Sequence, residues 1–274
     1  MSAVTPSVPK LEAPGRVTFA RVLASEWTKF RSVRSTVWSA AIAILLTLGI
    51  PLIGAAVVSS QWRQMDPGSR GDNHPLDIAL VGISIAQLVV AVLGVLVISA
   101  EYSTGSIRST FTAVPKRLPV LAAKLVDYAA ASLGVMITAV LISFFATQAI
   151  FSGIRPLHLS ITDPGIARCV LLSAVYITMV GAFALALGAI TRNTAAGIAV
   201  FAAIFFVLIP LSHALPASWG DPIRKYLPAN AGIQMFQLHH DQYSLSPLAG
   251  GLVFAGYCAL AIAVAAFLLQ RRDV

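Results

Sequence analysis

Charged side chains are scarce in this sequence. Only 11% of its 274 residues are Asp, Glu, Lys or Arg, whereas 57% are hydrophobic and the mean hydropathy is +0.82. A soluble domain carries about a quarter charged residues, so this composition excludes an ordinary soluble globular protein and favours a membrane protein.

The few charges are segregated along the chain. Six long stretches between them carry no charge, and each exceeds the ~20 residues that an α-helix needs to cross a bilayer. None shows the alternation of apolar and polar residues that is typical of a β-barrel strand. The six charge-free stretches are Ser35–Trp62, Ile78–Ala100, Tyr128–Ile154, Cys169–Thr191, Asn193–Gly220 and Tyr243–Gln270. The sequence therefore predicts an all-α polytopic membrane protein with six transmembrane helices.

The beginning of the chain lacks the apolar core of a secretory signal peptide. Pro6, Pro9 and Pro14 lie in a polar segment, which favours a disordered cytoplasmic tail over residues 1–16. A single transmembrane domain over residues 17–274 follows in this interpretation.

Residues for catalysis or metal binding are also missing. The chain has no HExxH motif, and Cys169 and Cys258 have neither CxxC nor Cys/His ligand spacing. The Gly82-Ile83-Ser84 tripeptide weakly matches the motif of a membrane serine protease, but all five histidines fall in predicted outer loops, away from that serine. We expect no catalytic, cofactor-binding or metal site, and no enzyme activity in this chain.

Carboxylates are absent from the central turns of the predicted spans, which argues against a proton-coupled transporter. Asp127 is the nearest candidate, but it lies near the cytoplasmic end of the third span. Lys124 precedes it by three residues on the same helix face, so we predict a structural Lys124–Asp127 pair.

The basic charge is distributed unequally between the two sides of a six-span topology. Thirteen of the nineteen Lys and Arg residues fall on the side that holds both termini, and six fall on the other. The larger set is Lys10, Arg16, Arg21, Lys29, Arg31, Arg34, Arg108, Lys116, Arg117, Lys124, Arg192, Arg271 and Arg272. This asymmetry predicts that both termini are cytoplasmic and explains the net charge of +8 without nucleic-acid binding.

Residues 17–34 have the pattern of an interfacial helix before the first span. Large apolar residues recur at helical spacing, and basic residues occupy the other side. Trp27, Lys29 and Arg31 are the expected interfacial residues, in contact with the lipid bilayer. Two interpretations stay open: a simple topology anchor, or an elbow that also touches a cytosolic partner.

The connection between the fifth and sixth spans is long and semi-apolar. It runs as HALPASWGDPIRKYLPANAGIQMFQLHHDQYSLSP over residues 213–247. It carries too many large apolar side chains for a solvated loop, so we expect one or two short re-entrant outer helices there.

A polar seam, EYSTGSIRSTFTAVPKR (101–117), joins the second and third spans. Gly105 favours a turn and Pro115 a helix stop, with a two-turn helix between them. Its apolar face would carry Ile107, Phe111 and Val114, which we expect to fit a groove in a soluble partner. An interfacial turn without a partner is the alternative. Glu101 should be compensated by Arg108 or by the Arg31/Arg34 pair.

At these residues the chain resembles the permease subunit of the type-two ATP-binding-cassette exporter family. The resemblance covers nearly the whole chain. It is carried by the seam, by LASEWTKFRSVRSTVW (23–38) and by YLPANAG (226–232).

The resemblance implies a coupling helix between spans two and three that docks on a cytosolic ATP-binding-cassette ATPase subunit, and a second permease subunit, identical or different. The implied coupling residues are Glu101, Gly105, Arg108, Thr110, Phe111, Pro115 and Arg117. No Gly-Lys dipeptide occurs in this sequence, so ATP and Mg²⁺ would be bound by the partner ATPase.

Members of the family export drugs, antibiotics, peptides, lipids or polysaccharides. The phenylalanines of span five favour a hydrophobic or amphipathic cargo here, with Ser84, Gln87, Phe201 and Phe205 as the candidate substrate path. The alternatives are a membrane scaffold that anchors an ATPase for antibiotic sensing or immunity, and an ion-coupled secondary transporter.

Overall fold

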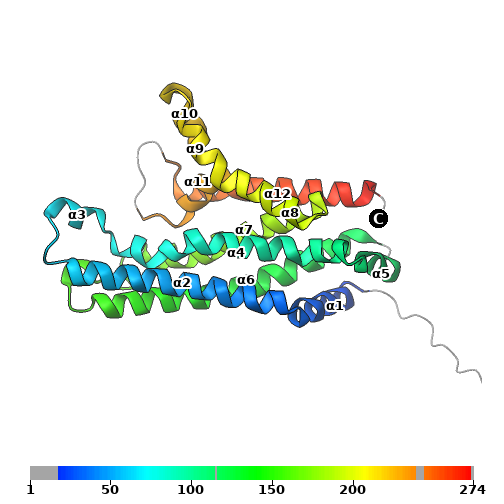
Figure 1. The fold of residues 1–274 in the computed structure, drawn as a ribbon, viewed down its shortest axis with the longest axis horizontal. Coiled ribbons are helices and arrows are strands. Elements are labelled where there is room, and N and C mark those ends of the chain that lie inside the picture. Colours follow the sequence, from blue (N-terminus) through cyan, green and yellow to red (C-terminus); the bar gives the residue numbers. More distant parts are fainter. Residues whose placement is uncertain (1–17, 115, 239–243, 273–274) are drawn as a thin grey trace, which may run out of the picture.

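The protein is an α-helical membrane protein built from six long apolar helices (Figure 1). The computed structural model describes residues 18–114, 116–238 and 244–272, so the predicted tail 1–16 and Pro115 lie outside the described residues. The helices that can cross a membrane are α2 (Arg34–Gln61), α4 (Pro75–Ser103), α6 (Arg117–Phe151), α7 (Ile166–Thr191), the continuous run of α8 (Thr194–Ala202), η2 (Ala203–Val207) and α9 (Leu208–His213), and α12 (Pro247–Arg271).

Helices α4 and α7 form the centre of the bundle and are the two most buried spans. Glycines allow their close approach: a Cβ at Gly94 of α4 would overlap the carbonyl of Gly181 of α7. Because lipid is as apolar as a leucine side chain, such small-residue packing is what holds membrane helices together. Apolar side chains on the other spans, such as Trp38 and Leu45 of α2, are exposed and face outward as lipid-contacting residues do.

Span five departs from a regular α-helix at η2, a π-helical turn. The turn ends three residues before Pro210, whose missing N–H removes the α-helical hydrogen bond to the carbonyl of Phe206. Between spans four and five the chain reverses at Arg192, in the left-handed conformation (φ 53°), and Asn193 caps α8 by accepting from the Ala196 N–H at 3.0 Å. The fourth and fifth spans are therefore joined by a tight turn.

One end of the bundle gathers α1 (Phe19–Ser32), α5 (Ser106–Ala113) and the C-terminal end of α12 (Figure 1). There Arg117 donates to the carbonyls of Leu269 at 2.9 Å and Arg272 at 2.7 Å. Arg272 in turn donates to the carbonyl of Ile190 at 3.1 Å. The first turn of α6 and the last turns of α7 and α12 therefore meet at what we call the basic end.

The opposite end carries α3 (Pro67–Asp72), η1 (Arg155–Leu157), α10 (Ala217–Arg224), α11 (Pro228–Ile233) and η3 (Gln234–Phe236). The segment α11–η3 folds back against α7 and α12, with Met235 and Phe236 buried. By contrast, α10 projects from the bundle, and Trp219 is 71% exposed. Only part of the long connection therefore packs as the expected re-entrant segment.

Candidate functional site: a buried charge cluster beneath a short helix

The site is assembled on α1, α4 and α6 at the basic end. Helix α1 ends at Ser32, and the extended conformation of Val33 (ψ 119°) separates it from α2. This break lets α1 lie against α6, where Val22 packs on Val120 and Ala123. One turn after Val22, the same face of α1 brings Glu26 into the protein, where it is 4% exposed.

Helix α5 begins directly after Gly105, which has a positive φ of 73°. Only glycine adopts that conformation freely, so Gly105 allows the chain to leave α4 and restart as a new helix. Helix α5 ends at Ala113, as the predicted stop before Pro115 required.

The apolar face of α5 packs within its own chain. Ile107 is 3% exposed, and Phe111 and Val114 pack on the cluster formed by Val22, Val120 and Ala123. Helices α1 and α6 therefore take up part of this face, and a groove in a partner for the rest of it stays a prediction. The exposed side chains of α5 are Ser106, Arg108, Ser109, Thr112 and Ala113.

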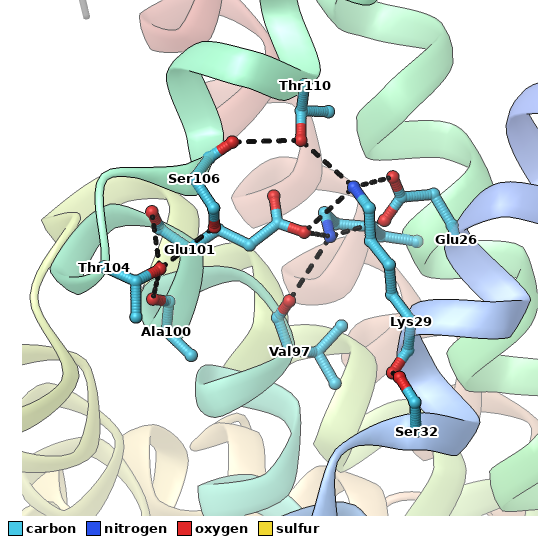
Figure 2. A network of polar contacts seen from close by, with 10 residues as sticks. Glu26, Lys29, Ser32, Val97, Ala100, Glu101, Thr104, Ser106 and Thr110 are labelled. Atoms are coloured by element: carbon cyan, nitrogen blue, oxygen red, sulfur yellow. Dashed lines mark hydrogen bonds and ion pairs between the residues drawn. The ribbon is translucent and has the colours of Figure 1, made fainter.

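Below α5, two lysines and two glutamates form an alternating charge cluster (Figure 2). Lys124 Nζ lies 2.6 Å from Glu26 Oε2 and 2.8 Å from Glu101 Oε1. Lys29 Nζ lies 2.7 Å from Glu26 Oε1 and 3.2 Å from Glu101 Oε1. Each ammonium group thus bridges the same two carboxylates and ties α1, α4 and α6 together.

The cluster also reaches α5. Lys29 donates to Thr110 Oγ1 at 3.0 Å (Figure 2). Lys124 donates to the carbonyl of Val97 at 3.4 Å. Thr110 in turn donates to the carbonyl of Ser106 at 3.2 Å, within α5. A displacement of α5 would therefore act directly on Lys29, and through Glu101 and Glu26 on α4 and α1.

The charged side chains of the cluster differ in how deeply they are buried. Lys124 is 3% and Glu26 4% exposed, whereas Lys29 at 39% reaches solvent. Burial alone would lower the pKa of Lys29, but the hydrogen bond to Glu26 and the charges of Glu101 and Glu26 raise it above its ordinary value. Removing one partner of a buried pair leaves an uncompensated charge, so the Lys124–Glu26 contact is the one whose loss matters most.

Two sequence predictions about these charges were wrong. Lys124 does not pair with Asp127 but reaches across to Glu26 and Glu101. Glu101 is compensated by Lys29 and Lys124, and not by Arg108, Arg31 or Arg34. Local i,i+3 spacing brings two charges near each other, but shorter contacts from neighbouring helices take precedence here.

Asp127 lies beside the cluster without joining it. It is 6% exposed, and its Oδ2 has no hydrogen-bond partner in the part of the chain that the structure describes. The same holds for Oε2 of Glu101. Both residues line a cavity of about 80 Å³ between α1, α2, α4 and α6.

The remaining predicted interfacial and coupling residues lie near this site. Trp27 is 38% exposed on α1 and stacks on Phe30, with ring centroids 6.1 Å apart. Arg31 is exposed, and the guanidinium of Arg117 lies 5.4 Å from the ring centroid of Phe111.

The four residues predicted as a substrate path do not meet at this site. Gln87 is buried, and its side-chain oxygen accepts from Tyr176 at 2.7 Å, while Ser84 is exposed. Phe201 and Phe205 are each 1% exposed and stack at 4.4 Å inside an aromatic core with Phe183 and Phe254. These phenylalanines therefore serve in packing.

Glu26 is the site residue that sequence reasoning missed. Its signal was present, because position 26 continues the apolar series Phe19, Val22, Leu23 and Phe30 at helical spacing. A carboxylate on the apolar face of an amphipathic helix needs a buried cation, and Lys124 supplies it.

No protein-family model and no curated protein sequence matches this chain.

Proposed function

We propose that this chain is the permease subunit of an ATP-binding-cassette exporter in a bacterial plasma membrane. It would move a hydrophobic or amphipathic substrate, using ATP hydrolysed by a separate cytosolic subunit, with a second permease subunit completing the pathway. Its six membrane helices fit a transmembrane transport subunit.

The observation that carries the proposal is the set of contacts that hold α5 against the bundle. The apolar side chains of α5 pack on α1 and α6. Lys29 holds α5 through a hydrogen bond to Thr110, and the polar side of α5 is exposed at the basic end. A short helix that is held at the end of a bundle and exposes its polar face is suited to transmit a movement of a docked soluble protein to the membrane helices.

The chemistry of the exposed face defines the partner surface. Arg108, Ser109 and Thr112 present one cation and two hydroxyl groups. Complementary acidic and hydrogen-bonding groups on the ATPase would match it, and such charge pairs govern the rate and specificity of docking. The chain has no Gly-Lys dipeptide and hence no Walker A loop, which supports a separate ATPase chain.

Orientation follows from the same charges. The positive-inside rule makes the basic end cytoplasmic, so α5 would face the compartment that contains ATP. An ATPase docked there would act on the Lys29–Glu101–Lys124–Glu26 cluster that joins three helices.

The test is reversal of charge at Arg108. The tagged chain is purified from its native membrane with its ATP-binding-cassette ATPase, and co-purification and ATP hydrolysis are measured for Arg108→Glu. Arg155→Glu, an equally exposed arginine at the opposite end of the bundle, is the matched control. We expect unchanged membrane levels for both variants, with ATPase recovery and stimulation lost only for Arg108→Glu; full retention of both would refute docking at α5.

One observation favours a second function. Asp127 is a buried carboxylate within a membrane helix, as ion-coupled transporters require. Transport into inverted vesicles separates the candidates: an ATP-driven exporter continues at constant ATP when an uncoupler collapses the proton gradient, and a secondary transporter stops. A scaffold that only anchors an ATPase would transport nothing in either condition.

A further inference from the structure

A second, mostly apolar cavity adjoins the cavity beside Asp127, and the two share lining residues. The first, of about 80 Å³, is lined by all five charged residues of the site. The second, of about 60 Å³, is lined mostly by apolar side chains of α1, α2, α4 and α6, together with Thr36, Tyr128 and Ser132. Phe30, Thr36 and Leu93 line both. The two therefore form one amphiphilic pocket, charged at one end and apolar at the other.

The register of the helices orients this pocket along the bundle. The charged part is lined near the beginnings of α2 and α6, by residues such as Ser35 and Lys124. The apolar part lies farther along both helices, at Ala43 and Met136. The charged part is thus closest to the basic end, and the apolar part points toward the middle of the membrane spans.

The charges of the pocket are not balanced. Glu26, Glu101 and Asp127 supply three carboxylates, whereas Lys29 and Lys124 supply two ammonium groups, which are already bound to the glutamates. With all five groups ionised, one negative charge is in excess, and it lies beside Asp127. Oδ2 of Asp127 and Oε2 of Glu101 are both buried acceptors that lack a donor among the described residues.

We propose that this pocket binds a primary amphiphilic amine. Its ammonium group donates to Asp127 Oδ2 and Glu101 Oε2, and its alkyl chain occupies the apolar part between α2, α4 and α6. A primary ammonium has three N–H donors and a single positive charge, which matches both the excess charge and the acceptors without a donor.

Other ligand classes fit less well. An anion would meet excess negative charge, and a quaternary ammonium has no N–H to donate. A metal ion would need several free ligands, and the described residues contain no group of three or more His, Cys, Asp or Glu side chains placed to hold one. Only an amine with an apolar tail uses both parts of the pocket. The site lies within one chain, so binding does not depend on the ATPase of the proposed function.

The test measures binding of radiolabelled n-octylamine to the full chain in lipid nanodiscs without ATP. Unlabelled n-octylamine should compete, whereas n-octanol, octanoate and octyltrimethylammonium should compete poorly. Asp127→Asn should weaken binding roughly tenfold or more, as expected for loss of a charged hydrogen bond. Asp77→Asn, an exposed carboxylate near the start of α4 at the opposite end, should bind like the wild type.

A steric variant keeps the test decisive if Asp127→Asn does not fold. Ala131→Leu fills the apolar part while keeping the carboxylate, and Ala130→Leu places the same bulk on the exposed side of α6. We expect only Ala131→Leu to lose n-octylamine. Equal binding by Ala131→Leu and Ala130→Leu, or equal competition by n-octanol, would overturn the proposal, whatever happens to ATPase docking.

Discussion

Lys124 and Glu26, 98 residues apart in the sequence, form the shortest ion pair described at the basic end, with Nζ and Oε2 2.6 Å apart. The contact fixes an interfacial helix to a membrane span, because α1 carries the glutamate and α6 the lysine. Both side chains are almost completely buried, so neither can be hydrated by the solvent if its partner is removed.

The first prediction concerns this pair. Lys124→Met should lower the free energy of unfolding by about 3–5 kcal/mol, because it leaves Glu26 and Glu101 with an uncompensated buried charge. The midpoint of thermal unfolding in detergent would measure the loss. Glu26→Gln combined with Lys124→Met should be less destabilising than the sum of the single changes, and strict additivity would show that the two residues do not interact.

The second prediction separates folding from docking at α5. Phe111→Ala should destabilise the chain by about 2 kcal/mol, roughly half the cost of truncating a fully buried phenylalanine, because the ring is half-buried against α1 and α6. Arg108→Glu should leave the unfolding midpoint unchanged, since Arg108 is exposed. A fully stable Phe111→Ala would mean that its ring does not contribute to packing.

The spans were predictable because one physical constraint dominates them. Charge is excluded from the part of a helix that crosses hydrocarbon, so each charge-free stretch overlaps one of the six membrane helices. The limits of α5 were predictable for a similar reason, since Gly105 and Pro115 restrict the backbone locally. Local rules of this kind act on neighbouring residues and can be read in sequence order.

The charge cluster was not predictable in this way. Its pairs depend on α1 folding back onto α6, which requires the extended residue Val33 between α1 and α2. The sequence correctly placed Lys29, Glu101 and Lys124 at the same end of the bundle, but spacing along one helix assigned Lys124 to Asp127. The ion pairs depend on how α1, α4 and α6 converge in space. The spacing of two charged residues along one helix does not predict that arrangement.

The third prediction concerns the backbone at Gly105. Gly105→Ala should destabilise the chain by about 1–2 kcal/mol, because φ is 73° there, although a Cβ added at this position would meet no atom within 4 Å. Gly134→Ala is the matched control, since its Cβ would also meet nothing within 4 Å but φ is helical, and it should be neutral or slightly stabilising. Equal unfolding midpoints for the two variants would contradict the strain at Gly105.

The fourth prediction concerns pH. Burial opposes charge on Lys29, yet Glu26 and Glu101 raise the pKa of Lys29 above 10.5. A raised folded-state pKa means that the stabilisation by Lys29 is fully present below 10.5 and is lost as the pH rises through the higher, folded-state value. The stability difference between the wild type and Lys29→Met should therefore be constant through the neutral range and shrink only in strong alkali; a decrease near neutral pH would contradict it.

The last prediction fixes the orientation of the bundle. Cys169 and Cys258 are both buried, and their replacement by alanine gives a background for single-cysteine labelling. Ser109→Cys on α5 and Ser152→Cys at the opposite end are both exposed, so each would react wherever a membrane-impermeant maleimide can reach it. The excess of cations at the end that carries α5 predicts that this end is cytoplasmic. In intact cells we therefore expect labelling of position 152 alone, and of position 109 only after permeabilisation. Labelling of position 109 from outside would reverse the orientation and remove α5 from the reach of any cytosolic ATPase.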